Sequence, residues 1–77
     1  MPIDICTIVN VYPVPTMAEG VTRFQVVSAN RIYTTIHDWQ AALCERASRK
    51  YFPVRIVWRD TRFGPEMVEC EALEQRP

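Results

Sequence analysis

The chain has little of what most enzyme active sites are built from. Its 77 residues include two glycines and one histidine. Two glycines cannot form the glycine-rich loops that hold nucleotide phosphates. Metal sites made of cysteine and histidine need clustered ligands such as Cys-x-x-Cys, and the sequence has no such cluster. These absences predict a protein without catalytic function, cofactor or bound metal.

The reactive side chains that are present are isolated from one another. His37 is next to Asp38, but neighbours along a helix point in different directions and cannot act as a pair. Cys44 falls in the middle of a predicted helix, away from the N-terminal end that would activate a thiol. All three cysteines are expected at inward positions, where a free thiol behaves as a small apolar group: Cys6, Cys44 and Cys70.

Long apolar runs are also missing. No stretch approaches the ~20 apolar residues that a membrane-spanning helix needs. The N-terminus lacks the basic flank and the cleavage site of a signal peptide. Three widely spaced cysteines are unlike the paired cysteines of small secreted domains. These features predict a cytoplasmic protein with reduced thiols and no membrane partner.

The net charge is zero, but the charges are segregated along the chain. Residues 23–65 hold eight basic and three acidic groups, whereas residues 66–77 hold four glutamates and one arginine. A basic middle and an acidic end indicate either a nucleic-acid surface or basic and acidic strands that pair within the fold.

One helix is predicted over residues 35–52. Thr34 or Thr35 can cap its N-terminus, and Pro53 ends it by forcing the preceding residue towards an extended conformation. Apolar residues recur every three or four positions and should form one stripe of the helix that packs on a sheet: Ile36, Trp39, Leu43, Ala47 and Tyr51.

Four segments rich in β-branched and aromatic residues are predicted to be strands, at residues 3–12, 21–29, 54–60 and 66–73. Residues 30–31 either form a turn or continue the second predicted strand, because Ile32 and Tyr33 after them are again good strand formers. The order β-β-α-β-β predicts an α+β fold, a four-stranded antiparallel sheet with one helix packed on one face. The chain should form a single domain, 1–77, with a frayed tail at about 74–77.

The last two predicted strands should form a hairpin through the turn at residues 60–65. In that hairpin Arg55 and Arg59 lie across from acidic residues of the last strand, Glu69 and Glu71. Opposite charges pair well across neighbouring strands. This arrangement gives the basic residues of the third predicted strand partners within the fold.

Apolar side chains in predicted loops indicate an interface with another molecule. Val14 and Met17 are in a proline-containing loop at residues 13–20, and Arg62 and Phe63 are in the turn at residues 60–65. These four residues are the predicted protein-binding site. For Val14 and Met17 taken by themselves, the first interpretation is that they fold back onto the core, and the binding loop is the alternative. The expected partner is a different protein or a second copy of the chain in a homodimer.

A nucleic-acid-binding module is the alternative function. Five basic residues can follow a phosphate backbone, with Tyr51 or Phe63 available to stack on bases: Arg46, Arg49, Lys50, Arg55 and Arg59. Against this alternative, the isoelectric point of about 6.5 is far below the basic value typical of such domains.

The predicted function is therefore a small non-catalytic protein-binding module. Many inhibitors of host complexes encoded by phages and mobile elements, anti-CRISPR proteins among them, share this size and architecture. An inhibitor of a host complex is therefore the narrower hypothesis, by analogy of size and architecture only. A structural subunit of a homo-oligomer is a third alternative.

Overall fold

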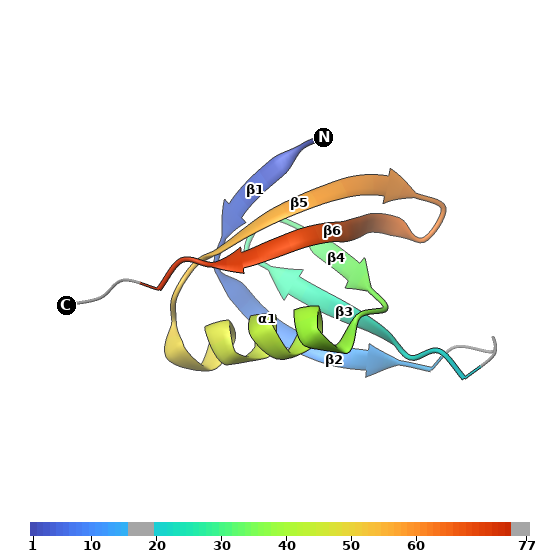
Figure 1. Cartoon of the computed structure of the whole chain (residues 1–77), viewed down its shortest axis with the longest axis horizontal. Coiled ribbons are helices and arrows are strands. Elements are labelled where there is room, and N and C mark those ends of the chain that lie inside the picture. The colour runs from blue at the N-terminus through green and yellow to red at the C-terminus, as the bar shows by residue number, and fades with distance from the viewer. Residues whose placement is uncertain (16–19, 75–77) are drawn as a thin grey trace.

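The computed structural model describes residues 1–15 and 20–74, which form one six-stranded sheet and one helix (Figure 1). The strands lie across the sheet in the order β1-β5-β6-β4-β3-β2. Along the chain the elements are β1 (Ile3–Cys6), β2 (Ile8–Val14), β3 (Arg23–Ser28), β4 (Ile32–Thr35), α1 (Asp38–Lys50), β5 (Val54–Thr61) and β6 (Gly64–Ala72).

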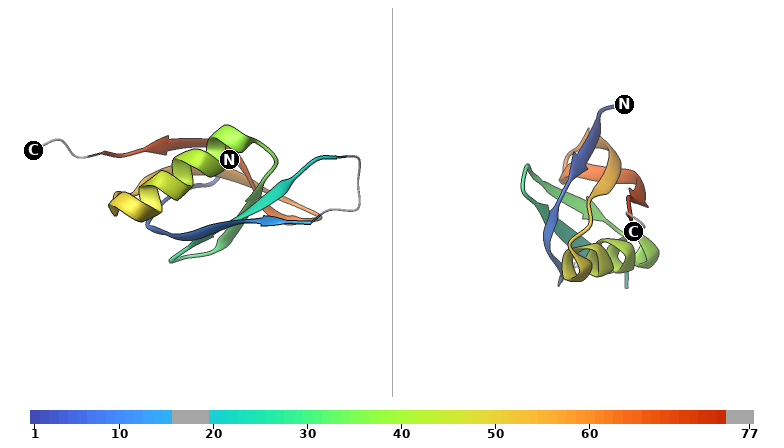
Figure 2. Two further views of the ribbon diagram at one scale, coloured as in Figure 1. Left: turned by 90° about the horizontal axis from the view of Figure 1, so that it is seen from below. Right: turned by 90° about the vertical axis from the view of Figure 1, so that its left-hand side faces the viewer.

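The N-terminal strand is bent at Thr7 and contributes to both edges of the sheet. Its first half, β1, pairs with β5, and its second half, β2, pairs with β3, both antiparallel. At the bend, the carbonyl of Thr7 accepts a hydrogen bond from the amide of Ala29 at 3.1 Å. Because one residue connects the two edges, the sheet must curl, and α1 lies across its open side (Figure 2).

The prediction of a four-stranded antiparallel sheet is wrong, although an α+β fold with a single helix is confirmed. The predicted strand at residues 3–12 bends and supplies two strands instead of one. Residues Ile32–Thr35 form β4, a separate strand that pairs antiparallel with β3 and precedes the helix. β4 also pairs in parallel with β6 at Thr34 and Glu66, so the sheet is mixed.

The additional strand β4 follows a tight turn after β3. The hydroxyl of Ser28 donates to the carbonyl of Arg31 at 2.7 Å and accepts from the amides of Asn30 and Arg31 at 3.2 and 3.0 Å. A serine hydroxyl that bonds the following backbone in this way favours a chain reversal. Ile32 and Tyr33 therefore begin a new strand instead of continuing the old one.

The core lies inside the curled sheet and under α1. Tyr33 and Trp58 pack edge to face there, with ring centroids 6.3 Å apart. Two of the three cysteines are buried and the third is half-buried, so the thiols occupy inward or partly inward positions. The buried cluster consists of Cys6, Ile8, Val26, Tyr33, Cys44, Ala47, Phe52, Val54, Ile56, Trp58 and Met67.

The helix begins at Asp38 and ends at Lys50, within the predicted segment but shorter at its N-terminus. His37 occupies the N-cap position, so neither predicted threonine cap is correct. Thr35 belongs to β4, and its hydroxyl accepts a hydrogen bond from the amide of His37 at 3.1 Å. Tyr51 follows the helix in the left-handed conformation, with φ of 59°.

The buried face of α1 is not the apolar stripe that was predicted. Ala47 is buried as expected, but Trp39 is 58% exposed and Leu43 is only half-buried. Ile36 and Tyr51 lie outside the helix and are exposed. The residues of α1 that are buried are Gln40, Ala41, Cys44 and Ala47.

Hydrogen bonds from Gln40 account for this rotation of the helix. The hydroxyl of Thr35 donates to Gln40 Oε1, and Gln40 Nε2 donates to the carbonyl of Val68 on β6 at 3.2 Å. A buried amide with its donors and acceptors paired is tolerated, whereas an unpaired one is costly. The small side chains of Ala41, Cys44 and Ala47 then allow the helix backbone to approach the sheet.

The predicted hairpin of the last two strands is confirmed. β5 and β6 pair antiparallel along their whole length, with Thr61 opposite Gly64 at the turn. Arg55 lies opposite Glu71 as expected. Arg59 has a different acidic partner, Glu66, at 3.1 Å. An irregularity in the register between Val57 and Trp58 shifts the pairing, so a count along an ideal ladder misplaces this partner.

Candidate protein-binding site

The C-terminal end of β2, the start of β3 and the turn after β5 lie at the same end of the molecule (Figure 1). The guanidinium carbon of Arg23, at the start of β3, lies 4.4 Å from the centre of the Phe63 ring. Val14 is directly opposite Arg23 in the β2–β3 ladder, so their side chains are on the same face of the sheet. The tertiary fold therefore links the end of β2 to the turn after β5 through Arg23, which lies opposite Val14 and over the ring of Phe63.

We call this region the hairpin-end surface and define it by four residues. Three of them were predicted from the sequence, and Arg23 was not. The fourth predicted residue, Met17, lies outside the described residues. The hairpin-end surface consists of Val14, Arg23, Arg62 and Phe63.

Local hydrogen bonds hold the turn that carries Phe63. The hydroxyl of Thr61 donates to the carbonyl of Gly64 at 2.9 Å and accepts from the amide of Phe63 at 3.1 Å. Gly64 has a φ of 95°, a conformation that side chains with a Cβ rarely adopt. The two residues between the paired ends, Arg62 and Phe63, therefore project from a closed turn.

Phe63 is 57% exposed, and two guanidinium groups lie over its ring. Arg23 is 4.4 Å from its ring centre and Arg62 is 5.1 Å from it. Cations over an aromatic face attract the ring electrostatically. The side chain is therefore held in place while much of its apolar surface stays in contact with solvent.

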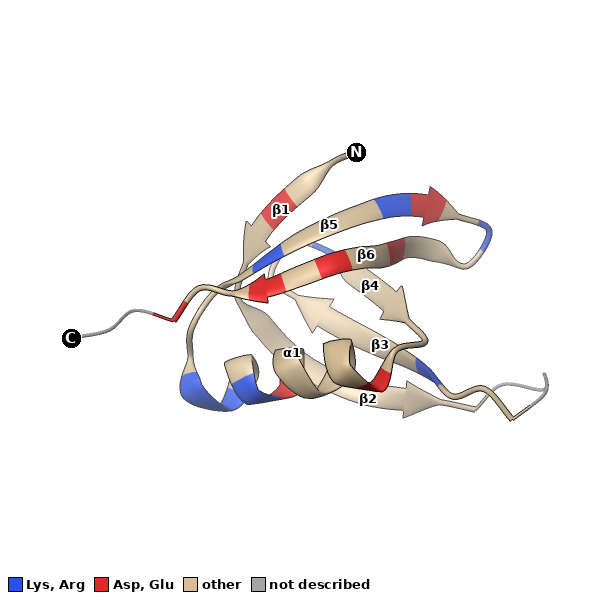
Figure 3. Cartoon of the chain, in the orientation of Figure 1, with Lys and Arg blue, Asp and Glu red and all other residues tan. Residues whose placement is uncertain are grey.

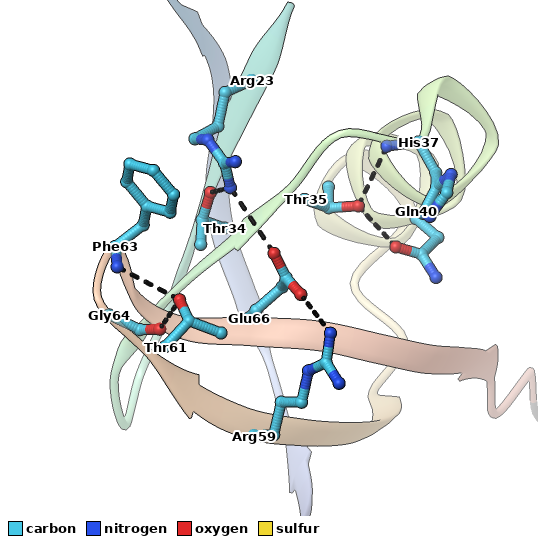
Figure 4. Close-up of polar contacts among 10 residues, drawn as sticks. All are labelled: Arg23, Thr34, Thr35, His37, Gln40, Arg59, Thr61, Phe63, Gly64 and Glu66. Carbon is cyan, nitrogen blue, oxygen red and sulfur yellow. Dashed lines mark hydrogen bonds and ion pairs between the residues drawn. The ribbon is translucent and has the colours of Figure 1, made fainter.

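A network of polar contacts with Thr34 and Glu66 holds the guanidinium group of Arg23 (Figure 4). Arg23 Nη1 donates to Thr34 Oγ1 at 3.0 Å and lies 3.7 Å from Glu66 Oε2. The other oxygen of Glu66 accepts from Arg59 Nη2 at 3.1 Å. The carboxylate of Glu66 on β6 therefore bridges Arg23 on β3 and Arg59 on β5, and Arg23 also bonds to Thr34 on β4. These contacts fix the guanidinium group that lies over the Phe63 ring.

The five basic residues of the nucleic-acid alternative are spread over two parts of the molecule, and β6 carries glutamates between them (Figure 3). Arg46 Nη2 lies 3.9 Å from Glu74 Oε1, and Arg59 is bonded to Glu66. Arg55 is half-buried and lies opposite Glu71. Arg49 and Lys50 are exposed at the C-terminal end of α1.

Perturbed pKa values belong to core groups away from the hairpin-end surface. A hydrogen bond between the thiols of Cys44 and Cys70 raises the pKa of Cys44, and burial raises it further. The same bond lowers the pKa of Cys70. Burial also raises the pKa of Tyr33, whose hydroxyl donates to the carboxylate of Asp4. These shifts follow from packing and from partners inside the fold.

Two signals in the sequence could have pointed to the polar contacts that were missed. Asp4 is a single charge in an apolar strand, and Gln40 is a single amide among small residues of the helix. Isolated polar residues in buried segments normally have hydrogen-bond partners. The partners themselves, Tyr33 and Val68, are far away in the sequence and follow no local pattern.

No protein-family model, no curated protein and no solved structure matches the chain. Within residues 1–15 and 20–74, no group of three or more histidine, cysteine, aspartate or glutamate side chains is placed to hold a metal ion. The single helix of that part of the chain is too short and too polar to cross a membrane.

Proposed function

We propose that the chain is a non-catalytic protein-binding module and that the hairpin-end surface is its contact site. The observation that carries the proposal is the presentation of Phe63, which is 57% exposed and has the guanidinium groups of Arg23 and Arg62 over its ring. Aromatic and arginine side chains are enriched at the energetic centres of protein interfaces. A side chain that is already held in one position loses little conformational entropy when a partner covers it.

The chemistry of the surface also suggests what the partner presents. The ring of Phe63 fits an apolar pocket, and the exposed guanidinium of Arg62 at its rim favours a carboxylate on the partner. Arg23 shares the carboxylate of Glu66 with Arg59 and serves to position the ring. The proposed partner is therefore a protein with an apolar pocket and acidic residues around it.

The test is a quantitative pull-down with matched variants of the whole chain. Wild type, Phe63→Ala and Tyr51→Ala are immobilised and incubated with nuclease-treated lysate from the native host. Tyr51 is the control because it is an aromatic residue that is 87% exposed and directly follows α1. The C-terminal end of α1 lies at the opposite end of the molecule from the turn after β5 (Figure 1). A partner that binds wild type and Tyr51→Ala should be lost with Phe63→Ala.

The purified partner then gives the affinity of each variant. An aromatic anchor at the centre of an interface contributes at least ~2 kcal/mol, so Phe63→Ala should weaken binding roughly 30-fold. The free energy of unfolding should change by less than ~0.5 kcal/mol, because the ring is exposed. A partner that binds Phe63→Ala as tightly as wild type would refute the hairpin-end surface as the contact site.

The narrower hypothesis, an inhibitor of a host complex, stays a prediction. It was an analogy of size and architecture, and the four-stranded architecture on which it partly depended is wrong. The nucleic-acid alternative also stays a prediction. Binding to random oligonucleotides that falls steeply with salt, and that is lost in an Arg49→Ala/Lys50→Ala variant, would favour it over protein binding.

A further inference from the structure

The two edges of the curled sheet are protected to different extents. At one edge, β2 pairs with β3 and contacts α1. At the other edge, β1 pairs only with β5, and no other described strand pairs with it (Figures 1 and 2). An open strand edge exposes backbone donors and acceptors that can pair with a further strand.

The hydrogen bonds of the β1–β5 ladder show which backbone groups are exposed. The amide of Trp58 donates to the carbonyl of Pro2 at 3.1 Å. In an antiparallel ladder, alternate residues direct their amide and carbonyl groups towards the same partner strand. Pro2, Asp4 and Cys6 therefore face β5, and Ile3 and Ile5 direct their backbone groups away from it.

The side chains of these two residues are exposed as well, Ile3 by 51% and Ile5 by 62%. Asp4, the one charged residue of β1, turns into the fold, where it lies 2.9 Å from Arg31 Nε and accepts from the hydroxyl of Tyr33. Edge strands are normally protected by an outward charge, a proline or a bulge. Within Ile3–Cys6, β1 has none of these. Its remaining protection is its length of four residues and the inward charge of Asp4, which is already paired with Arg31.

We propose that β1 is a self-association strand, which pairs antiparallel with β1 of a second copy of the chain. The twofold axis passes through Asp4, so Ile3 of each copy lies opposite Ile5 of the other. The amide and carbonyl of each isoleucine then bond across the axis, four backbone hydrogen bonds in all for this register. The residues of β1 are not part of the hairpin-end surface. This inference is therefore independent of the function proposed for that surface.

A second copy fits this edge because the edge is complementary to itself. A twofold contact requires that residue i meets j while j meets i. Both outward residues of β1 are isoleucine, so each apolar side chain meets another apolar side chain. The carboxylates of Asp4 approach across the axis, but each is already paired with Arg31 at 2.9 Å. The net charge of zero adds no overall repulsion between two copies.

The oligomeric state of the full chain tests the proposal directly. Analytical ultracentrifugation from micromolar concentration to about 1 mM covers the affinity expected for a short paired strand. The mass of wild type should rise from the monomer value of 9.0 kDa towards twice that value. A chain that stays monomeric up to the highest concentration overturns the proposal. A dimer whose interface does not include β1 overturns it as well.

Substitutions separate strand pairing from general apolar association. Ile5→Pro removes an amide that faces away from β5, so the folded monomer keeps its ladder while the dimer loses two symmetry-related bonds. Val9→Lys is the matched control, because Val9 is 64% exposed on β2 and contributes nothing to the proposed seam. Ile5→Pro should abolish the dimer and Val9→Lys should leave it intact. The reverse pattern overturns the proposal.

Hydrogen exchange gives a readout that does not depend on a variant that folds. The amides of Ile3 and Ile5 should exchange fast in dilute wild type and be protected at least 10-fold more strongly at high concentration, when most chains are paired. The amide of Asp4, which faces β5, should change little. Equal exchange of the Ile3 and Ile5 amides at both concentrations contradicts strand pairing even where the chain dimerises.

Discussion

Hydrophobicity predicts that the large apolar residues of α1 lie on its inner face and the polar residues on its outer face. The structure shows the reverse for Trp39 and Gln40. The inner face carries Gln40 and three small residues, whereas the outer face carries Trp39, which is 58% exposed. The large apolar residue is outside and the amide is inside. The face of α1 that is buried is the one whose small side chains pack closely on the sheet and whose amide, Gln40, finds hydrogen-bond partners there.

Each face of the helix can be tested separately. The inner face should be sensitive to both volume and polarity, because it is closely packed and its polar atoms have specific partners. The outer face should tolerate substitution, because solvent replaces what is removed.

The largest expected difference is in thiol reactivity. Cys44 is fully buried on the inner face, whereas Cys70 on β6 lines a shallow surface depression beside Trp39. A thiol reagent should modify Cys70 in the folded chain and reach Cys44 only when the chain unfolds. Mass spectrometry of peptides after brief alkylation measures both sites. Equal rates at the two sites would show that the inner face is accessible.

The same experiment carries a pH dependence. The hydrogen bond from the Cys44 thiol stabilises the Cys70 thiolate and lowers the pKa of Cys70. The thiolate is the reactive form, so the rate at Cys70 should reach half its maximum at a lower pH than the rate at an unperturbed cysteine. In Cys44→Ser, where a different donor replaces the thiol, this midpoint should move.

The next largest effect is expected for Gln40→Ala. The substitution removes the partner of the Val68 carbonyl and of the Thr35 hydroxyl, and it leaves a cavity. The free energy of unfolding should fall by about 3 kcal/mol. Urea denaturation measures it. Gln40→Leu restores the side-chain volume but not the hydrogen bonds, so most of the decrease in the free energy of unfolding should remain. Glu45→Ala, on the exposed side of the helix, should lower it by less than ~0.5 kcal/mol.

Ala47→Leu should cost about 2 kcal/mol, because Ala47 is 1% exposed and an extra side chain overpacks the core. Ala42→Leu is the matched control on the exposed face of the same helix. It should change the free energy of unfolding by less than ~0.5 kcal/mol. Thermal unfolding followed by circular dichroism compares the two. Similar losses at both positions would mean that the helix is not held in one orientation.

The smallest expected effect is stabilising. Tyr51 is 87% exposed and has a φ of 59°, a conformation that costs a residue with a Cβ roughly 1–2 kcal/mol. Tyr51→Gly removes this cost, and the greater freedom of glycine in the unfolded chain offsets part of the gain. Stability should rise by about 0.5 kcal/mol. Lys50→Gly, inside the helix, should lower it by about 0.8 kcal/mol.

The candidate site was predictable in part. Val14, Arg62 and Phe63 were identified because they interrupt turn sequences with apolar or basic side chains. Arg23 was not identified, because its place in an alternating strand is typical of a solvent-facing charge. Its contact with Phe63 joins two hairpins that are distant in the sequence. A single-sequence pattern contains no information about such a pair.

By itself, the sequence determined the features that depend on near neighbours along the chain. These are the existence of one helix before Pro53, the extended segments, and the β5–β6 hairpin with Arg55 opposite Glu71. Short-range periodicity and turn residues are sufficient for each of them.

The tertiary structure alone decided the bend at Thr7, the parallel contact of Thr34 with Glu66, and the face of α1 that is buried. Each joins segments far apart in the chain, and each is favourable only when the others have formed. Gln40 is acceptable in the interior because Val68 is there to accept its hydrogen bond. The orientation of α1 that buries Gln40 leaves Trp39 58% exposed.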